Sequence, residues 1–304
     1  MDPLSDVLAL LEARSYLSAA LVTGGDWAMR FSRPRSVKFT AVIRGGCWLV
    51  MDGLPAPLRL EAGDCFLLNR SGCVLASDPA LEPVPAVEVF AHAGDRTAHH
   101  GGFDDFHAIG GGVRLEGPDS GLLLDLLPSL IHVEGASGQA QALHWLIAQL
   151  AQELSAERPG ASLTADHLAH LMFVQVLRTY LASEAGSEAI GWLGALADRR
   201  IGAAIRRLHA EPARRWTLEE LATACGMSRS SFADRFKARV GVAPLDYLIR
   251  WRMRLAAAAL RKGAEPVSAI AAGVGYESES AFSNAFKRVT GSSPLLYRRS
   301  ARAA

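Results

Sequence analysis

Residues 218–247 read LEELATACGMSRSSFADRFKARVGVAPLDY, and residues 268–297 read SAIAAGVGYESESAFSNAFKRVTGSSPLLY. The second stretch repeats the first, because six identical pairs stand fifty positions apart: Phe232 and Phe282, Phe236 and Phe286, Lys237 and Lys287, Gly241 and Gly291, Pro244 and Pro294, and Tyr247 and Tyr297. Upstream of these pairs the offset is 49, so the second copy carries one extra residue in its turn. A repeat of this kind indicates a duplicated structural unit, which decides the fold of this part of the chain.

Each copy has the spacing of a helix-turn-helix unit. The first helix is expected to end at Gly226 or Gly275, because glycine tolerates the left-handed backbone that terminates a helix. Ser228 and Ser278 are suited to cap the second helix, and the exposed backbone amides at that end could also bind a DNA phosphate. Two phenylalanines four residues apart anchor one face of each second helix in the core. The opposite face is then free to enter a groove of DNA.

Residues 244–263, PLDYLIRWRMRLAAAALRKG, join the two copies. Pro244 suits a first helical turn, the alanine run favours a helix, and Gly263 is expected to end it. About 17 helical residues give a rod of roughly 25 Å. Such a rod can hold two recognition helices about one DNA turn, roughly 34 Å, apart. The alternative is that the duplicated pair is a scaffold for binding another protein.

The charge of the chain is divided between its two parts. Residues 199–304 contain 20 Lys and Arg against 8 Asp and Glu, a net charge of +12, whereas residues 1–198 carry −11. A positive domain attracts a polyanion through counterion release, and the acidic part avoids adding nonspecific affinity. The charge therefore favours nucleic acid over a protein partner for the duplicated units.

Composition limits the class of protein. The chain has 304 residues, of which 50% are hydrophobic and 21% charged, as in a globular protein of two or three domains. The N-terminus lacks the cationic stretch and apolar run of a secretory signal, and no run of about 18 apolar residues predicts a membrane span. The four cysteines, Cys47, Cys65, Cys73 and Cys225, have no CxxC spacing, which fits a reducing cytoplasm.

The pattern of hydrophobic and polar residues changes along the chain. Residues 1–20 have the spacing of a short amphipathic helix, and residues 27–115 contain short β-rich runs broken by Gly and Pro. Such runs predict a small antiparallel barrel or sandwich. Two amphipathic helices are expected within residues 138–157 and 164–186. Their apolar stripes could pack on the barrel or form a homodimer interface, and both alternatives stay open.

The stretches WTLEELATACGMSRSSFADRFKARVG and VSAIAAGVGYESESAFSNAFKRVTGSSPLLYRR carry a family resemblance. They resemble the DNA-binding domain of the AraC/XylS family of bacterial transcription regulators, over about residues 199–304. The resemblance implies seven helices with two helix-turn-helix units. It also implies binding to double-stranded promoter DNA, usually with activation of transcription, and RNA polymerase as a partner.

The resemblance also implies roles for single residues. Base edges are expected to be read by Ser230, Ala233 and Asp234 in the first copy and by Ser280, Ala281, Ser283 and Asn284 in the second. Asp234 could accept a hydrogen bond from cytosine N4, or it could form an ion pair with Arg235 or Arg239. Phosphate contacts are expected from Ser228, Arg229, Ser231, Arg235, Lys237, Ser278, Lys287 and Arg288, although Arg235 and Arg288 could simply be solvated.

The stretch FTAVIRGGCWLVMDGLPAPLRLEAGDCFLLNRSG resembles the cupin-type effector domain of one branch of the same family. The Gly63-Asp64 pair is expected to form the tight turn between two barrel strands. Cupin enzymes hold a metal with closely spaced His and Glu side chains, and this stretch lacks that set. We therefore expect no metal, no cofactor and no enzymatic activity. The cluster His92, His99, His100 and His107, with Asp104 and Asp105 nearby, is interpreted as a polar loop rather than a metal site.

A small organic effector is expected inside the barrel, against Phe39, Trp48, Phe66 and Phe90, although aromatic side chains would also fill an ordinary core. Cys47, Cys65 and Cys73 could instead sense oxidants, or they could be small buried hydrophobic residues. A cupin enzyme with a DNA-binding appendage is the remaining alternative.

The predicted fold class is α+β. An N-terminal antiparallel cupin-like β-barrel (residues 1–135) senses the effector, a central helical hairpin (136–195) serves for dimerisation or linkage, and a C-terminal all-α domain (199–304) binds DNA with two helix-turn-helix units. The predicted function is a cytoplasmic, effector-responsive transcription activator that forms a homodimer and does not contact membranes.

Overall fold

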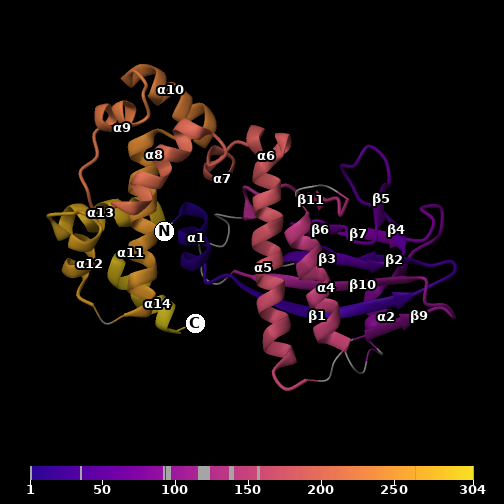
Figure 1. The fold of residues 1–304 in the computed structure, drawn as a ribbon. Coiled ribbons are helices and arrows are strands. Elements are labelled where there is room, and N and C mark those ends of the chain that lie inside the picture. The colour runs from indigo at the N-terminus through magenta and orange to yellow at the C-terminus, as the bar shows by residue number, and fades with distance from the viewer. Residues whose placement is uncertain are drawn as a thin grey trace. The chain divides into compact units, whose positions relative to one another are not determined.

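The computed structural model describes residues 2–34, 36–91, 93, 97–115, 124–136, 140–155, 158–263 and 265–303 (Figure 1). The chain forms two compact units, Glu12–Ser183 and Met1–Leu11 together with Glu184–Ala304. Strands and two long helices make up the first unit, and helices make up the second. The mixed α+β fold predicted from the sequence is confirmed. None of the helices within the described ranges is long and apolar enough to cross a membrane.

Two sheets form the first unit, and neither is closed into a ring. The larger sheet has six strands in the order β11-β6-β3-β10-β1-β9: β11 Leu130–Val133, β6 Cys65–Leu68, β3 Val37–Arg44, β10 Phe106–Arg114, β1 Arg14–Thr23 and β9 Thr97–His100. The smaller has five in the order β5-β4-β7-β2-β8: β5 Leu58–Glu61, β4 Gly46–Val50, β7 Cys73–Ala76, β2 Ala28–Phe31 and β8 Val84–Pro85. Neighbouring strands are antiparallel except for the pairs β1–β9 and β2–β8.

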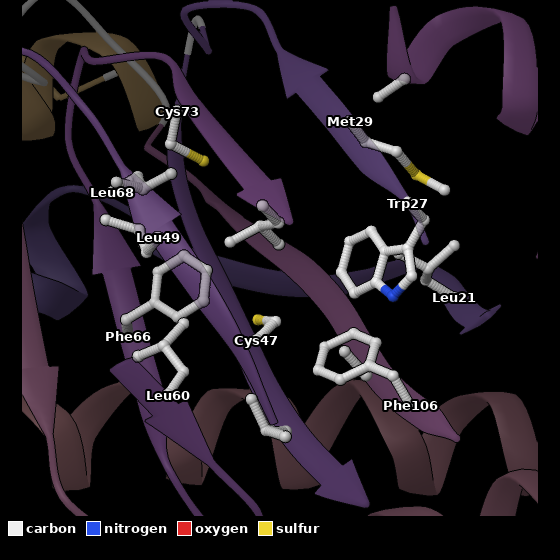
Figure 2. Close-up of a cluster of buried hydrophobic side chains, with 14 of the residues drawn as sticks. Leu21, Trp27, Met29, Cys47, Leu49, Leu60, Phe66, Leu68, Cys73 and Phe106 are labelled. Carbon is white, nitrogen blue, oxygen red and sulfur yellow. The ribbon is translucent and has the colours of Figure 1, made fainter. Parts of the chain in front are cut away.

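The core of this unit is a cluster of apolar side chains contributed by both sheets (Figure 2). Successive residues of a strand point to opposite faces, so the inward residues recur at every second position. On β6, for example, Phe66 and Leu68 belong to the cluster, whereas the buried Cys65 and Leu67 do not. The Gly63-Asp64 turn lies between β5 and β6 as predicted, and Gly63 has the left-handed φ of +93°.

Helices cover the outer face of the larger sheet (Figure 1). α4 (Gln141–Ser155) and α5 (Ala161–Ala182) pack against each other, and α5 lies on β1. Asp166 accepts a hydrogen bond from the Leu17 amide at 3.2 Å, next to an irregularity in the pairing of β1 with β10. The apolar stripes of these helices therefore pack on the strands, the first of the two alternatives left open by the sequence. The short helix α2 (Ala86–Phe90) follows β8.

The N-terminal segment differs from the predicted helix over residues 1–20. α1 spans only Pro3–Leu10, and Arg14 already begins β1. α1 packs on two helices of the second unit, α8 (Arg199–Ala210) and α11 (Pro244–Lys262), and buries Leu4, Val7 and Leu8. Only Tyr16, Val22 and Thr23 of β1 are residues that favour strands, so the strand depends on its pairing with β10 and β9 rather than on local propensity.

A buried histidine lies beside α1. The His209 ring stacks on Trp251 with 3.9 Å between ring centroids, and its Nε2 lies 2.8 Å from the Tyr247 hydroxyl. The Asp6 carboxylate of α1 lies 3.4 Å from His209 Nδ1. Burial lowers the pKa of His209 to about 3, so the ring is neutral at physiological pH and packs as an aromatic group. Through Asp6, α1 contacts this stacked histidine in the core of the second compact unit.

The remaining helices of the second unit follow in chain order. They are α6 Glu184–Glu188, α7 Trp192–Ala195, α8, α9 Leu218–Ala224, α10 Arg229–Val240, α11, α12 Val267–Gly273, α13 Glu279–Thr290 and α14 Pro294–Ala303. The seven helices that the resemblance implies are α8 to α14 in the described part of the chain. α9 with α10 and α12 with α13 are the two helix-turn-helix pairs, and α11 connects them (Figure 1).

Candidate nucleic-acid interface

The first helix-turn-helix unit has well-defined helix ends. Thr217 and Glu220 form a capping box at the start of α9, each side chain bonding the other residue's backbone amide. Gly226 follows with φ of +63°, and the Ser228 hydroxyl then accepts a hydrogen bond from the Ser231 amide to cap α10. These local signals fix where α10 begins, as the sequence predicted.

The second helix-turn-helix unit repeats this construction. Ser278 caps α13 by accepting from the Ala281 amide, and Gly275 supplies the left-handed turn with φ of +83°. A Cβ atom at Gly275 would lie 2.3 Å from the Ala213 carbonyl oxygen, so this glycine is needed for close approach as well as for its φ. Because Gly275 has no side chain, the turn of the second helix-turn-helix unit packs closely against the segment that precedes α9.

α11 connects the two helix-turn-helix units as a single helix. It begins with Pro244 at its first helical position, as predicted, and extends over 19 residues, or about 28 Å. The buried Ala256 and Ala257 let neighbouring helices approach closely, and α11 packs against α10, α12 and α13. Arg252 donates hydrogen bonds to the Pro212 and Arg214 carbonyls at 2.6 and 2.8 Å. The connection is therefore packed along its length, which suits a rigid spacer.

The recognition helices α10 and α13 turn their phenylalanines inward and a polar face outward. Phe232, Phe236, Phe282 and Phe286 are all 0% exposed. The residues predicted to read bases lie on the other side: Ser230, Asp234, Ser280, Ala281 and Asn284 are exposed, and Ala233 and Ser283 are half-buried. Each helix thus presents short polar side chains on a free face, the arrangement that direct readout in the major groove requires.

Cationic and hydroxyl side chains flank these faces. The predicted phosphate contacts Ser228, Arg229, Ser231, Lys237, Ser278, Lys287 and Arg288 are all exposed. Among the described residues, none of the ion pairs involves Arg229, Lys237, Lys287 or Arg288. Their charges are therefore available to an anionic partner.

Arg235 forms an ion pair that the sequence did not indicate. It was expected to contact phosphate, but its Nε donates to Asp198 Oδ2 at 2.9 Å and its second guanidinium nitrogen lies 2.8 Å from the same oxygen. Arg239 Nε lies 3.6 Å from that oxygen. Arg235 and Arg239 therefore neutralise Asp198 and do not pair with Asp234, the alternative considered for that residue. The phosphate contact of Arg235 stays a prediction, since 48% of its side chain remains exposed.

Asp198 is a site residue that the sequence did not reveal. Its side chain is 2% exposed, and besides pairing with the two arginines it caps α8 by accepting from the Arg200 and Ile201 amides at 3.0 and 3.1 Å. Burial would raise the pKa of Asp198, but the amide and guanidinium hydrogen bonds outweigh burial and lower it below 3.8. Asp198 thus ties the start of α8 to recognition helix α10. The only signal in the sequence was an Asp directly before a helical pattern.

Similarity to known proteins covers nearly the whole chain. A family model for cupins matches residues 2–182, and a family model for helix-turn-helix domains matches residues 221–300. An AraC-like transcription regulator of Streptomyces lividans is 48% identical over 300 residues, covering 98% of both chains. The chain belongs to the AraC family of transcription regulators. A similarly named Streptomyces antibioticus protein is also 48% identical, covering 98% of this chain and 99% of its own.

A third relative is the RCS-specific transcriptional activator RclR of Escherichia coli K12. It is 29% identical over 301 residues, covering 98% of this chain and 97% of its own. These relatives are regulators of transcription rather than enzymes, which agrees with the non-enzymatic function predicted from the sequence. This AraC-family regulator binds DNA through its helix-turn-helix domain.

The N-terminal unit of this AraC-family regulator contains a cavity of about 670 Å³. Phe39, Phe66 and Phe90, three of the four aromatic residues predicted for an effector pocket, border it. Trp48 does not, because it alternates with the buried Cys47 and Leu49 and so lies on the outer face of β4, with the Arg59 guanidinium over its ring. Trp48 therefore does not border this cavity, and its contact with an effector stays a prediction.

The three cysteines of the N-terminal unit are buried thiols. Burial raises the pKa of Cys47, Cys65 and Cys73 to about 12 in each case. Oxidant-sensing cysteines are accessible and have lowered pKa values. Cys65 also points to the face of β6 opposite the core cluster that contains Cys47 and Cys73. These observations favour packing over redox sensing.

The histidine-rich segment is not the loop that was predicted, because His99 and His100 lie on β9. In the part of the chain that the structure describes, no three His, Cys, Asp or Glu side chains converge to hold a metal. His92 lies outside the described residues. His107 lies on β10, and burial lowers its pKa. Asp64 accepts a hydrogen bond from the Gly135 amide at 2.8 Å and lies 3.0 Å from His132 Nε2. These two contacts join the Gly63-Asp64 turn to β11 and to the residues that follow it.

Proposed function

We propose that this protein is an effector-responsive activator that binds promoter DNA as a homodimer in the cytoplasm and acts on RNA polymerase. The observation that carries the proposal is the pair of capped recognition helices, α10 and α13, joined by one packed helix in a region of net charge +12. Activation is supported by the name of the relative RclR, and an activator bound beside a promoter acts on the enzyme that transcribes it.

We also propose roles for the exposed residues of the recognition helices. Ser230, Ala233 and Asp234 in α10, and Ser280, Ala281, Ser283 and Asn284 in α13, would read base edges. Arg229, Lys237, Lys287 and Arg288, with the hydroxyl groups of Ser228, Ser231 and Ser278, would contact phosphates. Their exposure on one side of each helix supports this division.

Replacing Lys287 and Asn284 by alanine tests this division of roles. Lys287→Ala should weaken binding to all DNA sequences alike and reduce the slope of log affinity against log salt by about one, because one phosphate contact is lost. Asn284→Ala should cost about 1–3 kcal/mol at the preferred site and relax the sequence preference at one position. Equal, sequence-blind losses for both variants, measured by fluorescence anisotropy on specific and random duplexes, would refute the assignment.

The homodimer interface is proposed on the outward side of α4 and α5. A groove of about 510 Å³ there is lined by Gln141, Ala142, Trp145, Leu146, Leu171 and Gln175. Trp145 is 60% exposed and Leu171 is 50% exposed. Its described lining has no charged residue, so an identical copy can face it without like-charge repulsion. An exposed apolar patch of this kind is typical of an interaction site. We therefore assign a second copy of the chain as its occupant.

Trp145→Glu should convert the dimer to a monomer, because two carboxylates would be buried across the two-fold interface. Sedimentation equilibrium at micromolar concentration measures the mass. Leu163→Glu is the matched control, since Leu163 is 65% exposed on α5 and does not line the groove. A monomeric wild type, or a Trp145→Glu variant that remains dimeric, would contradict the proposed interface.

A further inference from the structure

The cavity of the N-terminal unit lies between the two sheets. Its apolar lining comes from both of them and includes Leu21, Phe66 and Leu68 of the larger sheet and Leu75 of the smaller one. Figure 2 shows Leu21, Phe66 and Leu68 within the same group of side chains. The lining also includes Val87, which is 74% exposed, so the cavity is reached from solvent. A volume of about 670 Å³ suits a small organic molecule.

The charges on the lining have one sign. Lys38 and the exposed Arg30 border the cavity, and among the described residues its lining contains no Asp or Glu. This is unexpected from composition, because residues 1–198 carry a net charge of −11. Arg30 alternates with Met29 and Phe31, which pack in the core cluster, so Arg30 faces away from that cluster and Lys38 is the inward cation of the two. An inward cation with no acid among the described lining residues favours an anionic ligand over a neutral or cationic one.

Lys38 lies on the inward face of β3, which is an unusual position for a lysine. Strand alternation places it on the same face as Thr40 and as Val42, which is 0% exposed. In the sheet register Lys38 stands opposite Leu68 on one side and Gly112 on the other. The same face of β10 carries the buried Ala108, so the lysine extends a surface that is otherwise apolar.

Tyr16 holds the Lys38 ammonium in place. Lys38 Nζ donates to the Tyr16 hydroxyl at 3.0 Å and lies 4.9 Å from the centre of its ring. Gly112 makes this possible, because a Cβ atom there would lie 2.7 Å from the Tyr16 hydroxyl. The Arg114 guanidinium covers the ring at 4.8 Å. Burial would raise the pKa of Tyr16, but the hydrogen bond from Lys38 and the two cations outweigh burial and lower it below 10.0.

The Lys38 ammonium has more N–H donors than the Tyr16 hydroxyl accepts. An ammonium carries three N–H groups, and Tyr16 accepts from one of them. Within the described ranges no carboxylate forms an ion pair with Lys38, although the side chain is half-buried. A half-buried cation without a counter-charge is costly unless a partner arrives. A ligand carboxylate at this end of the cavity would supply that partner.

We propose that the cavity binds an amphipathic monocarboxylate. Lys38, oriented by Tyr16, binds the carboxylate, and the apolar body of the ligand lies along Leu21, Phe66 and Leu75. This inference rests on the proposed effector-responsive function and names the chemical class of the effector. The carboxylate fixes the orientation of the ligand, and the apolar body supplies most of the binding free energy.

Isothermal titration of the full-length protein with decanoate and with 1-decanol tests the proposal, because the two probes share their chain and differ in charge. Decanoate should bind at least tenfold more tightly than 1-decanol, since hydrogen bonds to charged groups contribute about 1.5–3 kcal/mol. Lys38→Met should remove that advantage by weakening decanoate binding, whereas Lys38→Arg should retain it. Arg178→Met, which removes an exposed cation of α5 outside the cavity, is the charge-matched control and should bind decanoate like wild type.

Gly110→Val tests where the probe binds. A Cβ atom at Gly110 would approach other atoms no closer than 3.5 Å, so a side chain can begin there without a clash, and Gly110 borders the cavity. This variant should weaken both probes. The proposal is overturned if wild type binds neither probe, if it binds both equally, or if Lys38→Met binds decanoate like wild type. Titration needs no DNA, so these outcomes are independent of whether the helix-turn-helix units bind a promoter.

Discussion

Gly275→Ala is expected to destabilise the second helix-turn-helix unit by about 2–5 kcal/mol. Two costs combine: the left-handed φ of +83° costs a residue with a Cβ about 1–2 kcal/mol, and the new Cβ would lie 2.3 Å from the Ala213 carbonyl oxygen. Overpacking of this kind adds about 1–3 kcal/mol when the neighbour cannot yield, and a backbone oxygen yields poorly. Hydrogen exchange over α12 and α13 in the full-length protein measures the loss.

Gly226→Ala is the matched control, because the two glycines occupy the same place in the duplicated units. Its φ of +63° carries a similar backbone cost, but an added Cβ would meet no atom within 4 Å. We therefore expect a loss of only about 1–2 kcal/mol. If the two variants lose equal stability, the contact of the second turn with Ala213 contributes nothing.

Asp198→Ala is expected to destabilise the C-terminal unit by about 2–3 kcal/mol. The substitution removes the cap of α8, worth about 1 kcal/mol, and it leaves Arg235 without the buried carboxylate that fixes it. Charge-assisted hydrogen bonds contribute about 1.5–3 kcal/mol, and the 48% exposure of Arg235 keeps the total near the lower end because water replaces part of the interaction. Affinity for DNA should fall as well, because Arg235 belongs to recognition helix α10.

The effect of Asp198 should depend on pH in one direction. Its pKa is lowered in the folded protein, so its stabilisation is fully present above the unfolded value of 3.8 and is lost as pH falls through the lower folded value. The difference in unfolding free energy between wild type and Asp198→Ala should therefore be constant near neutral pH and shrink in acid. Asp234→Ala is the control, since no ion pair in the described residues involves Asp234 and its removal should leave stability unchanged within about 0.5 kcal/mol. A constant difference down to pH 2 would contradict the ion-pair account.

Local sequence signals predicted the helix-turn-helix units well. Ser228 and Ser278 cap helices because a hydroxyl directly before a helix bonds its first amides, and Pro244 begins α11 because its φ is already helical. Phe232 and Phe282 are buried because helical spacing places them beside their partners four residues later. Each of these features depends on neighbours in the chain, which is why one sequence was sufficient.

The features that the sequence did not reveal depend on contacts between distant residues. Asp198 meets Arg235 across 37 positions, and α1 packs on helices about 200 residues away, so no local pattern indicates either. Trp48 was placed inside because it is aromatic, although alternation with Cys47 and Leu49 puts it outside. Lys38 was overlooked because a lysine in a strand ordinarily faces water, and only the sheet register shows that it faces the cavity.

The central claim is that both helix-turn-helix units bind one DNA duplex at the same time. Hydroxyl-radical footprinting of the full-length protein on the DNA flanking its gene tests this most directly. We predict two protected segments on one face of the duplex, about 10 base pairs apart for each bound copy, with the second lost in Gly275→Ala and retained in Gly226→Ala. A single protected segment per bound copy, or protection that does not change when the second helix-turn-helix unit is disrupted, would contradict the claim.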